Sequence, residues 1–161
     1  MSNPSQFLNQ SDFSTVIRST PLVSIDFIIV RPDGAALLGQ RHNEPAKGSW
    51  FVPGGRIRKN ERLDAAFERL LATETGLDIP RREAVQMGVY EHFYDTNVLG
   101  EPDFGTHYVV IAYQLEVGEG GVVTGDDQHT AFRWQMPADI VADPDVHPNT
   151  KAYFENSDTV I

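Results

Sequence analysis

The chain has 161 residues, a length suited to one domain with its own core, and we expect that domain to span residues 1–161. Its 13 basic and 23 acidic residues give a net charge of −10, which argues against nucleic acid as a partner. The sequence contains no apolar run of about 18 residues, so we expect no membrane partner. With no cysteine and no signal-peptide pattern, we expect a cytoplasmic protein.

The N-terminal part is predicted to form one helix and several strands separated by polar turns. In chain order we expect a helix at residues 11–18, a strand at 22–31, a hairpin turn at 32–34, a return strand at 35–41 and a strand end at 50–52. Ser11 is the expected N-cap, because its hydroxyl can accept a hydrogen bond from the first helical turn. Gly54 and Gly55 then open a polar segment that we expect to continue as a loop to Glu61.

A helix of about 14 residues is predicted after this loop, because apolar residues recur at three- and four-residue intervals. Gly76 is expected to end it. Glu74 follows Leu70 by four positions and so falls on the apolar stripe, although burying an unpaired carboxylate is costly. Two interpretations remain open for Glu74: a last-turn side chain that reaches water, or a metal ligand or catalytic carboxylate.

The C-terminal half is predicted to be mainly strands, followed by two short helices. We expect strands at residues 84–94, 106–117 and 131–134, a helix starting at Met136-Pro137, and a last helix at 147–154. Gln128 and His129 are expected in the acidic, glycine-rich loop before the last strand. Mixed strands with one long and several short helices indicate an α/β sandwich.

Four polar residues on the predicted strands each have a structural and a functional interpretation. Asp26 either faces solvent or lines a sugar pocket and orients an arginine. Arg41 is either solvated or grips a phosphate with its forked guanidinium. His92 is either a structural histidine or part of the site, and Tyr108 either packs in the core or hydrogen-bonds a phosphate through its hydroxyl.

The stretch from Gly55 to Leu77 resembles the Nudix box, G-x5-E-x7-R-E-U-x-E-E-x-G-U, where U is aliphatic. Seven of its nine positions match: Gly55, Glu61, Arg69, Leu71, Glu74, Gly76 and Leu77. The resemblance implies an α/β/α sandwich with a mixed sheet and a hydrolase that acts with a divalent metal. Leu70 and Thr73 stand where the pattern has glutamates, so the box retains one strong ligand, Glu74, and a cluster of several metals is not expected.

These departures, with the runs LVSIDFI and THYVV and a Gln-His pair before an Arg-Trp strand, are similar to the GDP-mannose mannosyl hydrolase branch of the family. The likeness extends from Phe7 to about Phe154. It implies hydrolysis of GDP-mannose, and secondarily GDP-glucose, to GDP and the free sugar. That branch cleaves the glycosyl C–O bond with inversion and works as a homodimer with one divalent ion, Mg²⁺ or possibly Mn²⁺, in each site.

The same resemblance implies the residues of the site. The expected metal ligands are Glu74, a backbone carbonyl at Gly54 or Gly55, and Gln128. The expected catalytic residues are His129 as general base, Arg41, Asp26 and Tyr108, and the expected substrate-binding residues are Arg41, Arg56, Arg69, Tyr108 and His92. Arg69 has a rival role as the ion-pair partner of Glu61 or Glu68. Two other functions stay open: a conventional Nudix diphosphatase that attacks phosphorus, and a degenerate domain that senses a nucleotide sugar without turnover.

Overall fold

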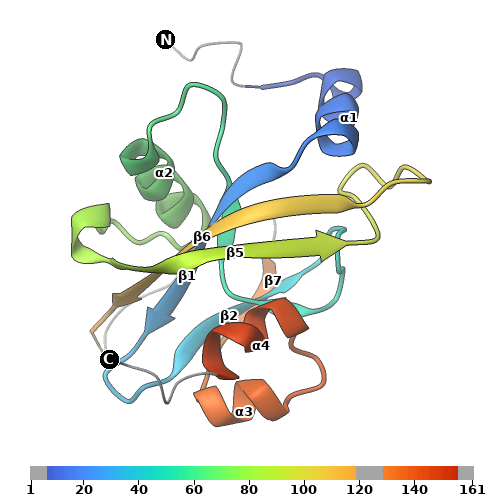
Figure 1. Ribbon diagram of the computed structural model, residues 1–161. Coiled ribbons are helices and arrows are strands. Elements are labelled where there is room, and N and C mark those ends of the chain that lie inside the picture. Colours follow the sequence, from blue (N-terminus) through green and yellow to red (C-terminus); the bar gives the residue numbers. More distant parts are fainter. Residues whose placement is uncertain (1–6, 119–128, 156–161) are drawn as a thin grey trace.

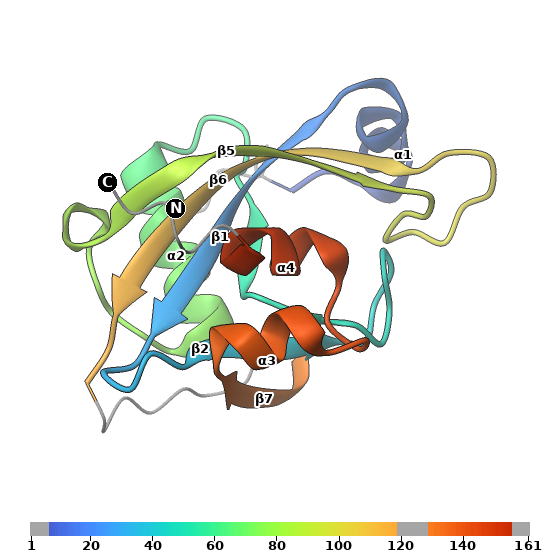
Figure 2. The ribbon, with the colours of Figure 1, turned by 60° about the horizontal axis from the view of Figure 1, so that its bottom comes forward.

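The fold is a mixed β-sheet with helices on both faces, seen in a computed structural model that describes residues 7–118 and 129–155. The side chains of residues 129 and 130 are outside this description. Helix α2 (Leu63–Thr75) covers one face of the sheet, and α3 (Pro137–Ala142) and α4 (Pro148–Glu155) cover the other, as Figure 1 and Figure 2 show from two directions. The predicted α/β/α sandwich is therefore confirmed.

Seven strands of the described residues form this sheet. They are β1 (Leu22–Val30), β2 (Ala36–Arg41), β3 (Trp50–Phe51), β4 (Gly54–Arg56), β5 (Val85–Tyr94), β6 (Thr106–Glu116) and β7 (His129–Gln135). The main order is β3-β2-β1-β6-β5, with β4 paired to β1 and β7 paired to β2. Only the pairing of β1 with β6 is parallel, so the sheet is mixed.

The described helices are α1 (Gln10–Ser19), α2 (Leu63–Thr75), a 3₁₀ turn (Arg81–Glu83), α3 (Pro137–Ala142) and α4 (Pro148–Glu155). All four α-helices lie where the sequence predicts them, to within one or two residues. The N-cap of α1 is Asn9, not Ser11, because the Asn9 side chain accepts the Asp12 amide at 2.8 Å. Gly76 ends α2 in the left-handed region with φ 74°, a conformation that glycine adopts at little cost.

The two faces of the sheet carry separate apolar clusters. On the α2 face, Phe67 packs edge-on against Phe27 and Tyr113, with ring centroids 5.0 and 5.2 Å apart. On the other face, Ile140, Tyr153 and neighbouring residues of the C-terminal segment pack against β1 and β2. The central strand β1 therefore supplies residues to both layers, which fixes the position of every side chain that it carries.

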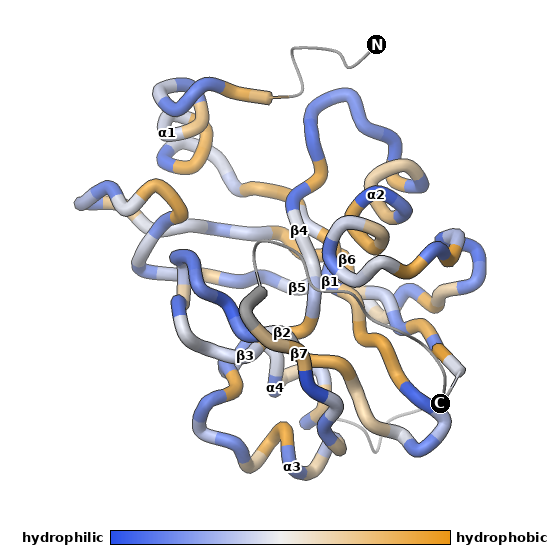
Figure 3. Tube along the Cα trace, turned by 180° about the vertical axis from the view of Figure 1, so that it is seen from behind, coloured by the Kyte–Doolittle hydropathy of each residue, from blue (hydrophilic) through white to orange (hydrophobic). Residues whose placement is uncertain are grey.

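Two local predictions about strands of this sheet were wrong. Gly54–Arg56 was expected to belong to a polar loop, yet it forms β4 and pairs antiparallel with residues 24–26 of β1. The polar segment that remains between β4 and α2 is largely hydrophilic in Figure 3. In addition, β7 begins at His129, two residues before the predicted start. Both errors concern strands whose pairing partners are distant in the sequence.

Within the described part of the chain, none of the helices has the length and apolar character needed to cross a lipid bilayer.

The core contact of Phe67 gives a first prediction. Phe67→Ala removes a fully buried ring and leaves a cavity between α2 and the sheet. We expect it to lower the free energy of unfolding by about 3–5 kcal/mol in urea denaturation. Phe93→Ala serves as the control, because Phe93 is 63% exposed and should cost about 1 kcal/mol or less. Equal losses for the two variants would contradict the packing described above.

Candidate active site

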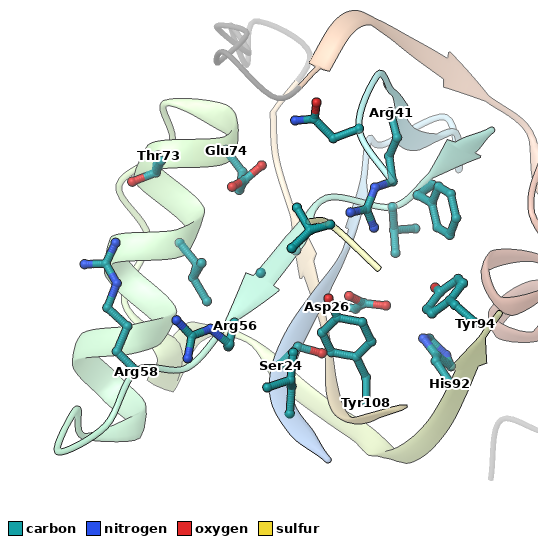
Figure 4. Close-up of a pocket in the computed structure, with 18 of the residues that line it drawn as sticks. Ser24, Asp26, Arg41, Arg56, Arg58, Thr73, Glu74, His92, Tyr94 and Tyr108 are labelled. Carbon is teal, nitrogen blue, oxygen red and sulfur yellow. The ribbon is translucent and has the colours of Figure 1, made fainter. Parts of the chain in front are cut away.

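A pocket of about 340 Å³ opens between α2, β4 and the N-terminal half of β1. Figure 4 shows Thr73 and Glu74 on the helix at one wall and Asp26, His92, Tyr94 and Tyr108 at the opposite wall. The pocket brings together nine residues that the sequence singles out: Asp26, Arg41, Gly54, Gly55, Arg56, Arg69, Glu74, His92 and Tyr108.

Two glycines of β4 bring the backbone into the middle of this pocket. A Cβ at Gly54 would collide with the carboxylate of Asp26 and the carbonyl of Ile25. A Cβ at Gly55 would collide with the side chain of Leu70 and lie 3.9 Å from Oε1 of Glu74. The absence of side chains at Gly54 and Gly55 therefore lets this backbone lie close to a carboxylate of β1 on one side and to α2 on the other.

Glu74 is buried, with only 2% of its surface exposed, although it belongs to the last turn of α2. The interpretation of a glutamate that reaches water is therefore wrong. Leu70 is also buried, at 4%, and joins the apolar cluster under the helix, whereas Thr73 is exposed at the rim. Within the described residues, α2 presents a single carboxylate to the pocket, that of Glu74.

Arg69 makes the ion pair that the sequence suggests as its rival role. Its Nε and one terminal nitrogen donate to the two carboxylate oxygens of Glu61 at 2.6 and 3.0 Å. The same terminal nitrogen donates to the carbonyl of Arg56 at 3.0 Å. These bonds hold the pKa of Glu61 below its ordinary value and fasten α2 to β4. Arg69 thus braces the loop, while its side chain still borders the pocket.

Asp26 lies in the pocket and does not face open solvent. The hydroxyl of Tyr153 donates to Oδ2 of Asp26 at 2.7 Å, and Nε2 of His92 lies 3.5 Å from the same hydroxyl. Burial raises the pKa of Asp26 to about 6, although Tyr153 and Arg41 act in the opposite direction. Burial lowers the pKa of His92 to about 4, so this imidazole is neutral at pH 7. Asp26, Tyr153 and His92 thus form a cluster of polar side chains at the far wall of the pocket.

Basic side chains give the pocket a positive lining despite the acidic chain. The guanidinium of Arg41 lies over the ring of Phe51 at 5.4 Å, and that of Arg56 lies over Phe13 at 4.7 Å. Burial lowers the pKa of Arg56 and raises that of Tyr108. Since an arginine stays charged even when its pKa falls somewhat, these groups can hold an anionic ligand.

Sequence reasoning missed four residues that take part in the site. Phe13, Arg58 and Tyr94 line the pocket, and Tyr153 supports Asp26 from α4. The apolar spacing of α1 accounts for Phe13 only as a packing residue. No local pattern marks the other three, because they come from segments that meet only in the folded chain.

The two remaining predicted residues are described in part or not at all. Gln128 lies outside the described residues. His129 is the first residue of β7. Its backbone pairs with Arg41 of β2, beside an irregularity in the register of the two strands. Because Arg41 lines the pocket, this pairing places the start of β7 at the pocket's edge.

The donor set suits a hard divalent cation. Glu74 and the carbonyls of Gly54 and Gly55 offer oxygen, the donor that Mg²⁺ and Mn²⁺ prefer. Among the described residues, no group of three or more histidine, cysteine, aspartate or glutamate side chains gathers as a metal site. The described part of the chain therefore offers few side-chain ligands, and a substrate diphosphate and water fit the remaining coordination of such an ion.

Comparison with known proteins identifies the family of this pocket. The sequence model described as the NUDIX domain matches residues 20–156, so the chain belongs to the Nudix family of hydrolases. It is 33% identical over 156 residues to the low-salt glycan biosynthesis protein Agl8 of Haloferax volcanii, covering 96% of this chain and 94% of that protein. It is 34% identical over 111 residues to the ADP-ribose pyrophosphatase of Methanocaldococcus jannaschii, covering 69% and 60%.

Solved structures agree with this assignment. The MutT NUDIX hydrolase of Burkholderia pseudomallei matches with a TM-score of 0.69 and 28% identity, over 86% of this chain and 99% of that one. The NUDIX domain of Shewanella oneidensis NrtR, crystallised with ADP ribose, matches with a TM-score of 0.65 over 92% and 96%. At 19% identity, the latter likeness shows the fold alone.

The environment of Asp26 gives a prediction about stability and pH. Because the folded state raises the pKa of this acid from 3.8 to about 6, it favours the protonated form. The contribution of the protonated Asp26 to the free energy of unfolding is fully present below about pH 4. It is lost as the pH rises through about 6, because the ionised carboxylate is then buried at a cost.

Asp26→Asn removes this cost and keeps an acceptor for Tyr153. We expect the variant to be more stable than the parent by about 2–3 kcal/mol at pH 8. The difference should shrink toward zero at pH 4. Urea denaturation across this pH range measures it, and a difference that is independent of pH would contradict the assignment of the shift to Asp26.

Proposed function

We propose that the chain hydrolyses GDP-mannose, and GDP-glucose secondarily, to GDP and the free hexose. In this reaction water attacks the anomeric carbon with inversion, and the glycosyl C–O bond breaks. The observation that carries the proposal is that α2 presents one carboxylate to the pocket among the described residues, that of Glu74. The two positions where the Nudix pattern has further glutamates hold Leu70, which is buried, and Thr73, which is exposed. One carboxylate suits a single cation on a departing diphosphate better than several cations around an attacked phosphorus.

Glu74, the carbonyl of Gly54 or Gly55, and Gln128 would hold one divalent ion, Mg²⁺ or Mn²⁺, in each site. When bound, that ion neutralises the charge that develops on the β-phosphate as GDP departs. Support comes from the closeness of Gly55 to Glu74: a Cβ at Gly55 would lie 3.9 Å from Oε1 of that carboxylate. Arg69 holds this arrangement rigid through Glu61 and the Arg56 carbonyl.

The diphosphate binds between the helix wall and the guanidinium groups of the lining. Arg41 and Arg56 lie over aromatic rings, and neither forms an ion pair with a carboxylate among the residues that the structure describes, so their donors can reach phosphate oxygens. The hydroxyl of Tyr108 adds a further donor from β6. The hexose then lies against the wall of the pocket formed by Asp26, His92 and Tyr94.

His129 serves as the general base in this proposal. An imidazole with an ordinary pKa of about 6.5 can take a proton from water near neutral pH. Inversion requires the water to lie on the face of the sugar opposite to GDP. Support comes from the backbone pairing of His129 with Arg41, a residue that lines the pocket.

The curated relatives favour a nucleotide derivative as the substrate class. Similarity to a glycan biosynthesis protein over nearly the full chain supports a sugar-linked nucleotide. Similarity to an ADP-ribose pyrophosphatase supports a second candidate, a diphosphatase that splits a nucleoside diphosphate sugar at phosphorus. We further propose that the protein works in the cytoplasm as a homodimer, as its resemblance implies.

The position of the broken bond separates the two candidates. We expect GDP-mannose hydrolysed in ¹⁸O-water with Mg²⁺ to give label in mannose and none in GDP, as measured by mass spectrometry. Label in a phosphate, with GMP and mannose 1-phosphate as products, would establish the diphosphatase instead. Tight Mg²⁺-dependent binding with no product over hours would identify a sensor domain.

Loss of the proposed base gives a separate prediction. His129→Gln should lower kcat by about 10²–10⁴, the usual contribution of general base catalysis, with little change in KM. His107→Gln is the matched control, because His107 stacks on Phe93 at 4.4 Å and does not line the pocket. Unchanged turnover in His129→Gln, measured with GDP-mannose, would end the assignment of His129 as base.

A further inference from the structure

One hydrogen bond of the C-terminal helix reaches a carboxylate of the pocket. The hydroxyl of Tyr153, on α4, donates to Oδ2 of Asp26 at 2.7 Å across 127 positions of sequence. Tyr153 is 8% exposed and does not line the pocket, so it lies behind Asp26 as seen from the ligand space. This geometry allows Tyr153 to act on a ligand only through its neighbours.

The two oxygens of the Asp26 carboxylate have different neighbours. Oδ2 accepts the bond from Tyr153, and Oδ1 lies so close to Gly54 that a Cβ there would collide with it. The helix that carries Tyr153 is itself anchored, because the Val52 amide donates to the Thr150 hydroxyl at 3.3 Å. The plane of the carboxylate is therefore set by β4 on one side and by α4 on the other.

The direction of the hydrogen bonds in this cluster follows from the acceptor. An ionised carboxylate only accepts, so the Tyr153 hydroxyl must donate its proton to Asp26. Burial and the nearby carboxylate raise the pKa of Tyr153 well above its ordinary value, which keeps that proton in place. The lone pairs of the hydroxyl then face Nε2 of His92, 3.5 Å away.

We propose that Tyr153 is a positioning residue of the active site, which orients the carboxylate of Asp26 toward the hexose. The inference rests on the proposed function, because it takes the hexose to lie against Asp26. An acceptor that recognises a sugar hydroxyl works only at a defined angle, and small misplacements near a reacting centre are costly. Tyr153 supplies that angle from a helix that does not touch the substrate.

Tyr153→Phe tests the inference, because it removes only the hydroxyl and keeps the buried ring. With GDP-mannose and Mg²⁺ we expect kcat to fall by about 10- to 100-fold, while KM changes by about threefold or less. Tyr90→Phe is the matched control: its ring packs edge-on against Tyr153 at 4.9 Å, but Tyr90 does not line the pocket. This variant should keep the kcat of the parent.

A double variant shows whether Tyr153 acts through Asp26. In an Asp26→Ala background there is no carboxylate to orient, so adding Tyr153→Phe should change kcat by less than about threefold. The same loss in both backgrounds would overturn the inference, and so would an unchanged kcat in Tyr153→Phe alone.

Failure of the proposed function would be visible in the parent protein itself. If the parent leaves GDP-mannose intact, the substrate proposal fails. The hydrogen bond between Tyr153 and Asp26 can then be tested by urea denaturation. Tyr153→Phe and Asp26→Ala should have non-additive effects on the urea midpoint when combined, because each removes the partner of the other. Additive effects would overturn the positioning role regardless of substrate.

Discussion

The site depends on the close approach of β4 to its neighbours on two sides. Gly54 lies against the carboxylate of Asp26, and Gly55 lies against Leu70 and close to Glu74. Because neither position has room for a Cβ, a carboxylate of the central strand and one of the helix border the same short backbone segment. The amide of Phe27 donates to the Pro53 carbonyl at 2.8 Å, which continues this attachment beyond the paired residues. The pocket therefore depends on the two glycines of β4, which separate the wall that carries Asp26 from the wall that carries Glu74.

Charge in the pocket is opposite in sign to charge on the chain. A protein with a net charge of −10 repels an anionic ligand at long range, so binding must come from fixed local donors. Arg69 is paired with Glu61, whereas Arg41 and Arg56 are held by the rings of Phe51 and Phe13. An aromatic ring orients a guanidinium without neutralising it. The pocket thus combines a braced arginine with others that keep their charge for a ligand.

The sequence predicted what depends on local periodicity and failed where distant segments meet. The helix stripe correctly placed Glu74 with the buried residues, because 3.6-residue periodicity is a local property. It did not reveal that Gly54–Arg56 is a strand, since three residues with two glycines have little strand propensity and pair only because β1 is adjacent. Tyr153 was missed for the same reason: its partner Asp26 is 127 positions away. Ser11 failed as the N-cap because Asn9, equally suited by chemistry, begins the helix earlier.

The replacement of an acidic residue by Leu70 connects stability with chemistry. Leu70 is 4% exposed, belongs to the apolar cluster under α2 and fills the space above Gly55. A glutamate there would lie one helical turn from Glu74, and two buried carboxylates at that spacing repel each other unless cations lie between them. Leucine removes that requirement and adds a packing contact, so the helix needs no second cation to remain stable. A site built in this way suits the reaction that we propose, in which one cation assists the departure of an intact nucleoside diphosphate.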